Sequence, residues 1–369
     1  MRRIDVAAGA AAGYPVLVVD EPAAAVRDLL DRHPGRRPAL LADEAVAATH
    51  APAILDAARS ADRSAELFTF PSGEASKSRA HWAALTDAMI DAGYGRDSIV
   101  VAVGGGVACD LAGFVAATYM RGVPLVQVPT SLLAMVDASV GGKTGIDVPG
   151  GKNLVGAFHP PAGVVIGLRT LATLPAEQLR EGLVEALKHG AIADAAYFER
   201  VAAGGPSAGG DVAFAADLVS RSVEIKAGVV AADPFEAGRR AILNFGHTVG
   251  HAIEAALDYR IGHGSAVGAG MVAEARAGEA LGVTASGTAA RLAAALRRLG
   301  VEAPPDIDVD RLVSAARRDK KNRAGATRAA LLERVGAVAR AADGGWTLPV
   351  PEPVLRTAWE AACRELREV

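Results

Sequence analysis

The chain of 369 residues is poor in cysteine, in aromatic residues and in net charge, and it has no long apolar run. Two cysteines, Cys109 and Cys363, are too few for a disulfide framework and favour a reducing compartment, so a cytoplasmic protein is expected. Asp5 interrupts the basic N-terminus and no unbroken apolar stretch follows it, which argues against an export signal. Because no stretch approaches about 18 uncharged apolar residues, no membrane span is expected.

The net charge of −3 and the aromatic content of 4% argue against two classes of partner. Nucleic acids and anionic membranes attract basic patches, and nucleic-acid-binding proteins interleave such patches with aromatic side chains. The sequence has no such basic stripe, so we expect neither a nucleic-acid nor a membrane partner. A small molecule is the expected partner.

Lysine is also scarce, since only seven of the 39 basic residues are lysine. Where any surface cation serves, this chain uses arginine, so a lysine marks a position where a compact ammonium with a movable proton is a candidate requirement. The seven are Lys77, Lys143, Lys152, Lys188, Lys226, Lys320 and Lys321. Ordinary solvated surface lysines are the competing interpretation. Because Lys143 and Lys152 lie in glycine-rich turns and Lys188 follows Glu185 by one helical turn, the set predicts a site for phosphate and carboxylate groups.

The first half of the chain alternates short apolar runs with helical stretches. Strands are predicted over residues 15–20, 38–43, 66–70, 98–103, 124–128 and 163–167, and helices over residues 21–31, 44–58 and 77–92. Apolar runs without polar alternation indicate strands that are covered on both faces. The pattern therefore predicts an α/β fold with a parallel sheet.

After about residue 170 the strand signal fades and helices dominate. They are predicted over residues 176–189, 194–202, 211–231, 240–257, 265–281, 288–299 and 351–368, with a short strand or hairpin over residues 328–334. A chain of this length exceeds one ordinary core. We therefore expect an α/β domain over residues 1–170 and an α-helical domain over residues 171–369.

A glycine turn over residues 101–107 joins a predicted strand to a predicted helix. Backbone amides in such a turn, at a helix N-terminus, bind pyrophosphate. The third spaced glycine of the dinucleotide fingerprint is missing, so a merely tight turn explains the run equally well. Asp43 at a strand end, and Glu74 and Lys77 in the turn that follows residue 70, are candidates for contacts to ribose or nicotinamide.

Three of the eight histidines, His247, His251 and His263, lie close together in the sequence. His247 and His251 share one helical face, and Glu185 lies on an earlier helix. A catalytic zinc site takes about three protein ligands from histidine, glutamate or cysteine and keeps one open position. A pair of hydrogen-bonded helix histidines is the competing interpretation. The zinc-protease motif is absent, because Thr248 stands where its glutamate would be.

Taken together, these segments resemble 3-dehydroquinate synthases of the sugar-phosphate cyclase superfamily. The resemblance runs from about residue 70 to residue 325. It is densest over residues 104–122, 128–161, 181–190 and 240–254, and His263-Gly264 and Asp319-Lys320-Lys321 also match. It implies a Rossmann-like, NAD-binding α/β domain followed by an α-helical domain that binds metal and substrate.

The resemblance also implies roles for individual residues. A zinc ion, or cobalt in its place, would be bound by Glu185, His247 and His263, and His251 would face the substrate instead. NAD would lie against Asp43, Glu74, Lys77, Gly104, Gly105, Gly106, Asp110, Thr130, Ser131, Lys143, Lys152 and Thr173. Catalytic and substrate contacts would come from Asp137, Lys143, Lys152, Asn153, Lys188, Lys226, Arg240, Asn244, His251 and Lys321. Arg121 would reach the phosphate site of the neighbouring subunit, which implies a homodimer.

The activity implied by the resemblance is conversion of a sugar phosphate, 3-deoxy-D-arabino-heptulosonate 7-phosphate, to 3-dehydroquinate and phosphate in the shikimate pathway. Transient oxidation by NAD would be followed by phosphate elimination, reduction and intramolecular aldol closure, without net redox change. The sequence departs from the usual family pattern at Ser131, Val184, Pro234 and Ser265. None of these departures removes an expected ligand or charged substrate contact.

Three alternative functions stay open. A related cyclase would make an amino-dehydroquinate, a valiolone or an inosose, although Lys226 and Arg240 favour a substrate with a carboxylate and so count against the last two. A metal-dependent polyol or glycerol-phosphate dehydrogenase would consume NAD(H) stoichiometrically. A non-catalytic scaffold would have no need of this full set of charged residues.

Overall fold

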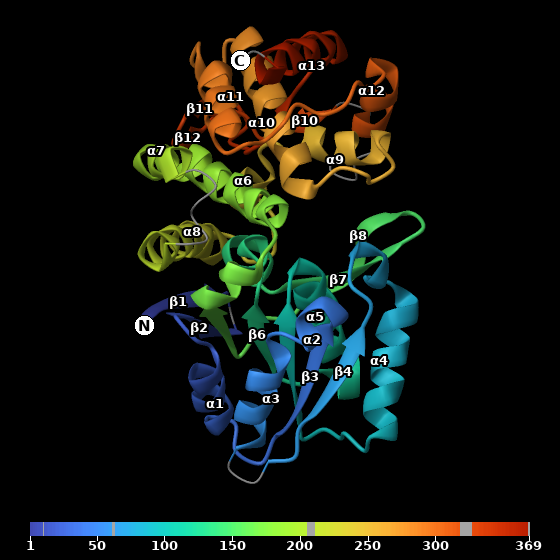
Figure 1. Ribbon diagram of the computed structural model, residues 1–369. Coiled ribbons are helices and arrows are strands. Elements are labelled where there is room, and N and C mark those ends of the chain that lie inside the picture. The colour runs from blue at the N-terminus through green and yellow to red at the C-terminus, as the bar shows by residue number, and fades with distance from the viewer. Residues whose placement is uncertain (10, 61–62, 205–210, 318–326, 368–369) are drawn as a thin grey trace. The chain divides into compact units, whose positions relative to one another are not determined.

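The computed structural model describes the chain except for residues 10, 61–62, 205–210, 318–326 and 368–369 (Figure 1). The chain forms two compact units: residues 1–174 with 209–231, and residues 175–208 with 232–369. The first unit contains a mainly parallel sheet with helices and the second is mostly helical, which confirms the expected mixed α/β class. The domain boundary near residue 170 stays a prediction.

A seven-stranded sheet forms the centre of the first unit, in the order β1-β2-β9-β6-β5-β3-β4 (Figure 1). The strands are β1 (Arg2–Ala8), β2 (Ala11–Val19), β3 (Arg37–Asp43), β4 (Glu66–Phe70), β5 (Ser98–Gly104), β6 (Leu125–Pro129) and β9 (Gly163–Gly167). All neighbouring pairs are parallel except β1 with β2. The six predicted strands all form. Strand β1 was not predicted, because its charged and apolar residues alternate, as is common at a sheet edge.

The central strands are buried because helices cover both faces of the sheet. Every residue of β5 is buried, and alternate side chains enter two different cores. Val100 and Ala102 pack with α4 (Arg79–Asp91) and α5 (Gly106–Thr118). Val101 and Val103 pack with α1 (Ala23–Asp31) and α3 (Ala51–Arg59). This two-sided burial is the physical reason that the apolar runs predicted the strands correctly.

The single helix predicted over residues 44–58 is wrong, because the chain forms two helices there. The short α2 (Glu44–Ala47) ends before a turn, and α3 begins at Ala51. Pro52 lies in the first turn of α3. A proline lacks the backbone N–H that a helix interior needs, so it is tolerated only at such a start.

A two-stranded hairpin, β7 (Lys143–Val148) and β8 (Gly151–Phe158), was not predicted from its glycine-rich sequence. Strand β7 packs against α5 at very close range. A Cβ added to Gly113 of α5 would lie 2.5 Å from Cγ2 of Thr144. The first unit also contains η1 (Glu74–Ser76), η2 (Tyr119–Arg121), the π-helix η3 (Ala134–Ala138), η4 (Leu168–Thr173) and most of α8 (Val212–Ala232).

Helices build most of the second unit. They are α6 (Ala176–Ala193), α7 (Ala195–Gly204), the 3-10 helix η6 (Arg239–Asn244), α9 (His247–Ala256), α10 (His263–Ala280), α11 (Thr288–Arg298), α12 (Val309–Arg317) and α13 (Glu352–Arg367). Two short pairs of strands accompany them: β10 (Arg328–Ala329) with β13 (Leu348–Pro349), and β11 (Leu332–Arg334) with β12 (Ala337–Val338). The continuous helix predicted over residues 240–257 is wrong. It breaks at Phe245 and Gly246, where Gly246 adopts a left-handed conformation with φ 80°.

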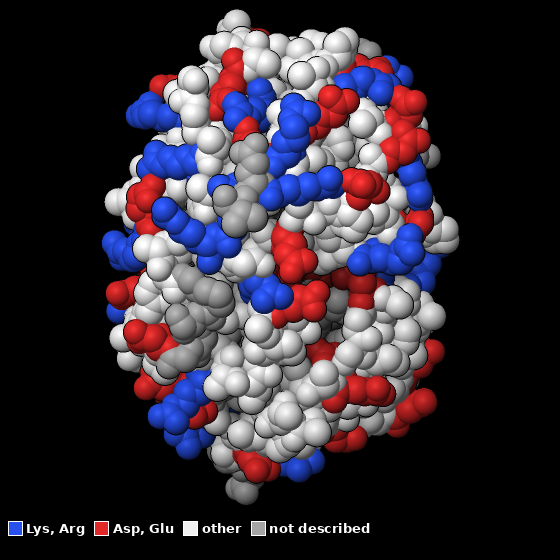
Figure 2. Space-filling model, turned by 45° about the horizontal axis from the view of Figure 1, so that its top comes forward, with Lys and Arg blue, Asp and Glu red and all other residues white. Residues whose placement is uncertain are grey.

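The surface carries charges of both signs. On the face shown in Figure 2, Lys and Arg side chains are interspersed with Asp and Glu side chains. In the described part of the chain, every helix is too short or too polar to cross a membrane.

Helices α9 and α10 approach each other backbone to backbone. A Cβ added to Gly270 would lie 2.0 Å from the carbonyl oxygen of Gly246 and 2.7 Å from the nitrogen of Gly250. Neither atom can move aside as a flexible side chain would, so Gly270→Ala is expected to lower the free energy of unfolding by about 2–3 kcal/mol. Gly228→Ala in α8 is the control, since its Cβ would meet no atom within 4 Å. Urea denaturation should show this variant to be as stable as the parent or more stable by up to about 1 kcal/mol. Equal stability of the two variants would contradict the prediction.

Candidate functional site

The expected nucleotide-binding residues lie at the carboxyl ends of the parallel strands. Asp43 ends β3 and Gly104 ends β5, while Thr130 and Ser131 follow β6 directly. Thr173 ends η4, which follows β9, and its hydroxyl lies 2.8 Å from Nε2 of His50. Ligands of open α/β sheets bind at this edge, which is where the sequence analysis expects the nucleotide.

The glycine turn brings a carboxylate close to the start of α5. Gly104 has φ 150°, and a Cβ there would lie 2.8 Å from Oδ2 of Asp43. Oδ1 of Asp43 accepts hydrogen bonds from the nitrogen of Ala45 at 3.0 Å and from the hydroxyl of Ser72 at 3.1 Å. The turn therefore places the start of α5 beside a fixed acceptor. Helix-start amides suit a phosphate group, and a carboxylate acceptor suits ribose hydroxyls.

A chain of alternating charges runs beside this turn. Nζ of Lys77 lies 2.6 Å from Oδ2 of Asp110, and Oε1 of Glu74 lies 3.9 Å from Nζ of Lys77 and 3.8 Å from Nζ of Lys152. Burial acts to lower the pKa of Lys77, but the charges of Asp110 and Glu74 outweigh it, and the pKa is raised overall. Lys77 therefore stays cationic. Glu74 thus lies between Lys77, which is expected to contact NAD, and Lys152, which is expected to contact both NAD and substrate.

The hairpin β7–β8 carries Lys143, Lys152 and Asn153, and a residue missed in the sequence analysis fixes it. Oδ1 of Asp147 accepts a hydrogen bond from the nitrogen of Asn153 at 2.8 Å, and the nitrogen of Asp147 donates to the carbonyl of Lys77 at 2.7 Å. Asn153 has φ 55°, a conformation that costs energy for a residue with a side chain. The turn sequence Asp-Val-Pro-Gly-Gly is the signal that could have revealed this role.

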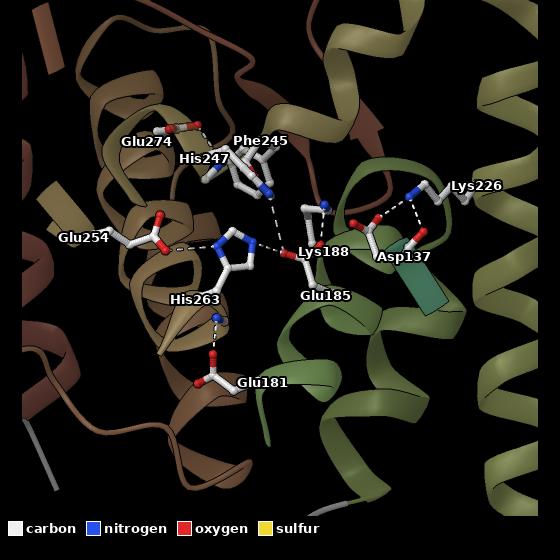
Figure 3. Close-up of polar contacts among 12 residues, drawn as sticks. Asp137, Glu181, Glu185, Lys188, Lys226, Phe245, His247, Glu254, His263 and Glu274 are labelled. Atoms are coloured by element: carbon white, nitrogen blue, oxygen red, sulfur yellow. Dashed lines mark hydrogen bonds and ion pairs between the residues drawn. The ribbon is translucent and has the colours of Figure 1, made fainter. Parts of the chain in front are cut away.

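Asp137 and Lys226 form a close pair within the first unit (Figure 3). Nζ of Lys226, on α8, donates to the backbone carbonyl and to Oδ1 of Asp137, each at 2.6 Å. Asp137 lies in the π-helix η3, and π-helical turns often mark functional sites. The pair fixes the ammonium of Lys226 at a defined position.

Lys143 and Arg121 are exposed at the surface of the first unit. Arg121 and its neighbour Met120 have φ values of 69° and 48°. Two successive non-glycine residues in this region are unusual, and such strain tends to occur at functional sites.

Glu185, His247 and His263 converge in the second unit, from helices α6, α9 and α10 (Figure 3). Oε1 of Glu185 lies 3.6 Å from Nε2 of His247 and 3.7 Å from Nε2 of His263. The three candidate ligand atoms all lie within 4.8 Å of one another. Two imidazoles and one carboxylate form the ligand set of a known class of catalytic zinc sites.

The Nδ1 atoms of His247 and His263, which point away from Glu185, each have a hydrogen-bond partner. Nδ1 of His247 lies 3.2 Å from the carbonyl oxygen of Phe245, and Nδ1 of His263 lies 3.4 Å from Oε1 of Glu254. The ring of His263 thus lies between the carboxylates of Glu254 and Glu185 (Figure 3). Such partners hold the proton on Nδ1 and direct the lone pair of Nε2 to a metal.

Two further observations fit a cation at this cluster. Burial acts to lower the pKa of His263, but the hydrogen bond and charge of Glu254, with the charge of Glu185, outweigh it and raise the pKa. The surroundings therefore favour positive charge. Glu185 is fully buried, and among the described residues no well-formed hydrogen bond reaches either of its oxygens, although the ammonium of Lys188 is in ion-pair contact with Oε2. Buried carboxylates are normally satisfied, so a bound cation would complete this one.

The other expected residues of the second unit are held by local contacts. The ring of His251 lies 5.4 Å from that of His247, and a second possible ligand group consists of His251, Glu254 and His263. Nδ2 of Asn244 donates to Glu236 at 2.9 Å. Lys320 and Lys321 lie outside the described residues.

Arg240 is buried, and a second residue missed in the sequence analysis fixes it. Oδ2 of Asp233 accepts from the nitrogen of Arg240 at 2.9 Å, and Nη1 of Arg240 donates to the carbonyl of Pro234 at 2.6 Å. Burial acts to raise the pKa of Asp233, but hydrogen bonds from the backbone nitrogens of Arg240, Ala237 and Gly238 outweigh it and lower the pKa. The loop before η6 therefore depends on an ionised Asp233.

The chain matches two family profiles, described as 3-dehydroquinate synthase N-terminal over residues 67–181 and 3-dehydroquinate synthase C-terminal over residues 182–322. A 3-dehydroquinate synthase of Symbiobacterium thermophilum is 48% identical over 321 residues, which cover 85% of this chain and 89% of the relative. A 2-epi-5-epi-valiolone synthase from Streptomyces hygroscopicus, solved with NAD⁺ and Zn²⁺ bound, is 26% identical with a TM-score of 0.86, covering 97% of this chain and 99% of that chain. A 2-deoxy-scyllo-inosose synthase was solved with carbaglucose-6-phosphate, NAD⁺ and Co²⁺. It is 23% identical with a TM-score of 0.88, and the match covers 98% of this chain and 100% of that chain. At this identity the likeness bears on the fold alone.

Proposed function

Since the chain belongs to the 3-dehydroquinate synthase family, we infer that it converts 3-deoxy-D-arabino-heptulosonate 7-phosphate to 3-dehydroquinate and phosphate. This is a step of aromatic amino-acid biosynthesis. The observation that carries the inference at the site is the convergence of Glu185, His247 and His263, together with a glycine turn at the carboxyl edge of the sheet. We also propose the roles of the individual site residues.

Two bound groups supply the reactivity of this chemistry. NAD accepts and returns a hydride, and a divalent cation, zinc or cobalt, acts as a Lewis acid toward substrate oxygens. The glycine turn and Asp43 would hold NAD. Glu185, His247 and His263 would hold the cation, which is supported by the buried carboxylate and by the directed Nε2 atoms.

The side chains of the protein would bind and orient the substrate. Lys143, Lys152 and Asn153 on the hairpin would hold the phosphate that leaves, together with Lys321. The guanidinium of Arg240 suits paired hydrogen bonds to a carboxylate, and Lys226, fixed by Asp137, would add a second positive charge there. Lys188 and His251 would exchange protons with substrate hydroxyls, because an ammonium and an imidazole both carry transferable protons.

An NAD-linked assay separates this function from that of a dehydrogenase. Purified protein incubated with the heptulosonate phosphate, catalytic NAD⁺ and Zn²⁺ is expected to release phosphate for many turnovers. No net absorbance should accumulate at the NADH band, because each cycle regenerates NAD⁺. Stoichiometric formation of NADH would instead favour a polyol or glycerol-phosphate dehydrogenase, and a product of amino-dehydroquinate mass would favour the amino cyclase.

We also propose a homodimer in which Arg121 acts in the partner's site. Exposed apolar side chains on β8, Leu154 and Phe158, and Met120 beside Arg121 support a contact surface in this region. Arg121→Ala and Lys152→Ala should each keep no more than about a hundredth of parental activity. A reassorted mixture of the two should recover about a quarter of parental activity, because half of the dimers would be hybrids with one intact site. Recovery near zero in a mixture that is shown to contain hybrids would place Arg121 in its own subunit's site.

A cytoplasmic location is part of the proposal. Cys109 and Cys363 are free thiols, as expected in a reducing compartment. Burial raises the pKa of the Cys363 thiol to about 11, so this side chain is unreactive at neutral pH.

A further inference from the structure

The two candidate histidine ligands share an unusual position, since each is the first residue of a helix. His247 begins α9 after Gly246, and His263 begins α10 after Gly262. A glycine has no side chain with which to cap the helix that follows it. The free N–H groups at each start must therefore find acceptors elsewhere.

At α9 the acceptor is a buried carboxylate from α10. Oε2 of Glu274 accepts from the nitrogen of Gly246 at 2.7 Å, and Oε1 accepts from the nitrogen of Val249 at 3.1 Å. Glu274 is 1% exposed. It lies one helical turn after Gly270, where the close approach of α9 and α10 lets a carboxylate reach the backbone of α9. Glu274 thus fixes the backbone on both sides of His247, at Gly246 and at Val249.

At α10 the acceptor comes from α6. The carboxylate of Glu181 accepts from the nitrogen of Gly264, from the nitrogen of Ser265 at 3.2 Å and from the hydroxyl of Ser265 at 2.8 Å. Glu181 lies one helical turn before Glu185, the third candidate ligand. Each helix that carries a histidine ligand is therefore capped by a glutamate from another ligand-bearing helix.

These caps matter for a cation because of the helix dipole. A helix start carries roughly half a positive charge, which opposes the binding of a divalent cation by a residue at that start. Two such starts supply the two imidazoles here. The carboxylates of Glu181 and Glu274 lie at the same starts and offset this charge while they hold the backbone of each histidine in place.

We propose that Glu181 and Glu274 are positioning residues of the metal centre, which hold His263 and His247 by capping their helices and raise the affinity of the centre for a divalent cation. The proposal rests on the metal centre of the proposed function. Neither glutamate belongs to a candidate ligand group among the described residues.

The helix α11 provides a matched control. It also begins after a left-handed glycine, Gly287, and Oε1 of Glu279 accepts from the nitrogen of Ala289 at 2.9 Å. Glu279 lies on α10, as Glu274 does, but α11 carries none of the candidate ligands. Removing this cap disturbs a helix start without touching a histidine.

The test measures zinc affinity by chelator competition on the full-length parent and on Glu274→Gln, Glu181→Gln and Glu279→Gln. Thermal unfolding of the metal-free proteins is measured alongside. Glutamine keeps an acceptor and loses the charge, so the first two variants should bind zinc about tenfold more weakly. Glu279→Gln should stay within about twofold of the parent even where its metal-free stability falls.

The outcomes test the positioning role of the two glutamates separately from the metal centre itself. Zinc affinity within about twofold of the parent in folded Glu274→Gln and Glu181→Gln, or an equal loss in Glu279→Gln, overturns the positioning role. A parent that binds no zinc contradicts the metal centre itself. If Glu274→Gln does not fold, the zinc affinity of Glu181→Gln alone tests the positioning role. The carboxylate of Glu181 is only half-buried, so the loss of its charge is better tolerated.

Discussion

His247→Ala is expected to remove bound zinc and to lower turnover by at least about a thousandfold. The imidazole Nε2 of His247 lies 3.6 Å from the carboxylate of Glu185, and with His263 these atoms form one compact group. Two remaining ligands hold a catalytic ion poorly, and loss of its charge from the transition state removes several kcal/mol of stabilisation. Elemental analysis for zinc and a phosphate-release assay measure the two effects on the same sample.

The matched control is His251→Ala. His251 lies on the same helix one turn later, and its ring is in edge-to-face contact with that of His247. The geometry also allows His251 to join Glu254 and His263 in an alternative ligand group. We expect His251→Ala to keep its zinc while losing activity through a substrate contact. If His251→Ala loses zinc and His247→Ala retains it, the alternative group is the metal centre.

Much of the fold could be predicted from the sequence, because a strand that is covered on both faces has an uninterrupted apolar run. Strand β5 is buried at every position, and its uninterrupted apolar run indicates this directly. The hairpin β7–β8 was missed because its glycines and lysines lack a strand pattern, and it is held by the packing of Thr144 on β7 against Gly113 of α5. The break at Gly246 was missed because apolar periodicity continues across it, and because Gly270, which lies against Gly246 in the fold, is far away in the sequence.

The candidate site was only partly predictable for the same reason. Spacing alone favoured His247 and His251 as a pair, and it could not show that Glu185 and His263 converge on His247 from two other helices. The ligand assignment itself stays a prediction, as do the NAD and substrate contacts. Asp147, Asp233 and Glu274 were not found, because their role is to accept backbone hydrogen bonds, and a sequence pattern does not reveal the geometry of a long-range acceptor.

Lys152→Ala is expected to lower kcat/KM for phosphate release by about a hundred- to a thousandfold, the usual cost of removing one group that stabilises developing charge. Lys152 is partly exposed on the hairpin, and its Nζ lies 3.8 Å from Oε1 of Glu74, a distance from which a substrate phosphate can draw it away. NAD affinity, measured by fluorescence titration, should change much less, because Lys77, Asp43 and the glycine turn remain.

Lys152→Arg tests whether the charge or its shape is required. An arginine keeps the positive charge but presents a planar fork in place of a compact ammonium. This chain uses arginine for most of its cations and yet has lysine here, so we expect Lys152→Arg to recover substrate binding, seen as a KM near the parental value, but only part of kcat. Full recovery of kcat would show that position 152 needs only a charge, and near-parental phosphate release by Lys152→Ala would show that Lys152 does not hold the leaving group. Either result would show that the scarcity of lysine in this chain is not evidence for a catalytic role of Lys152.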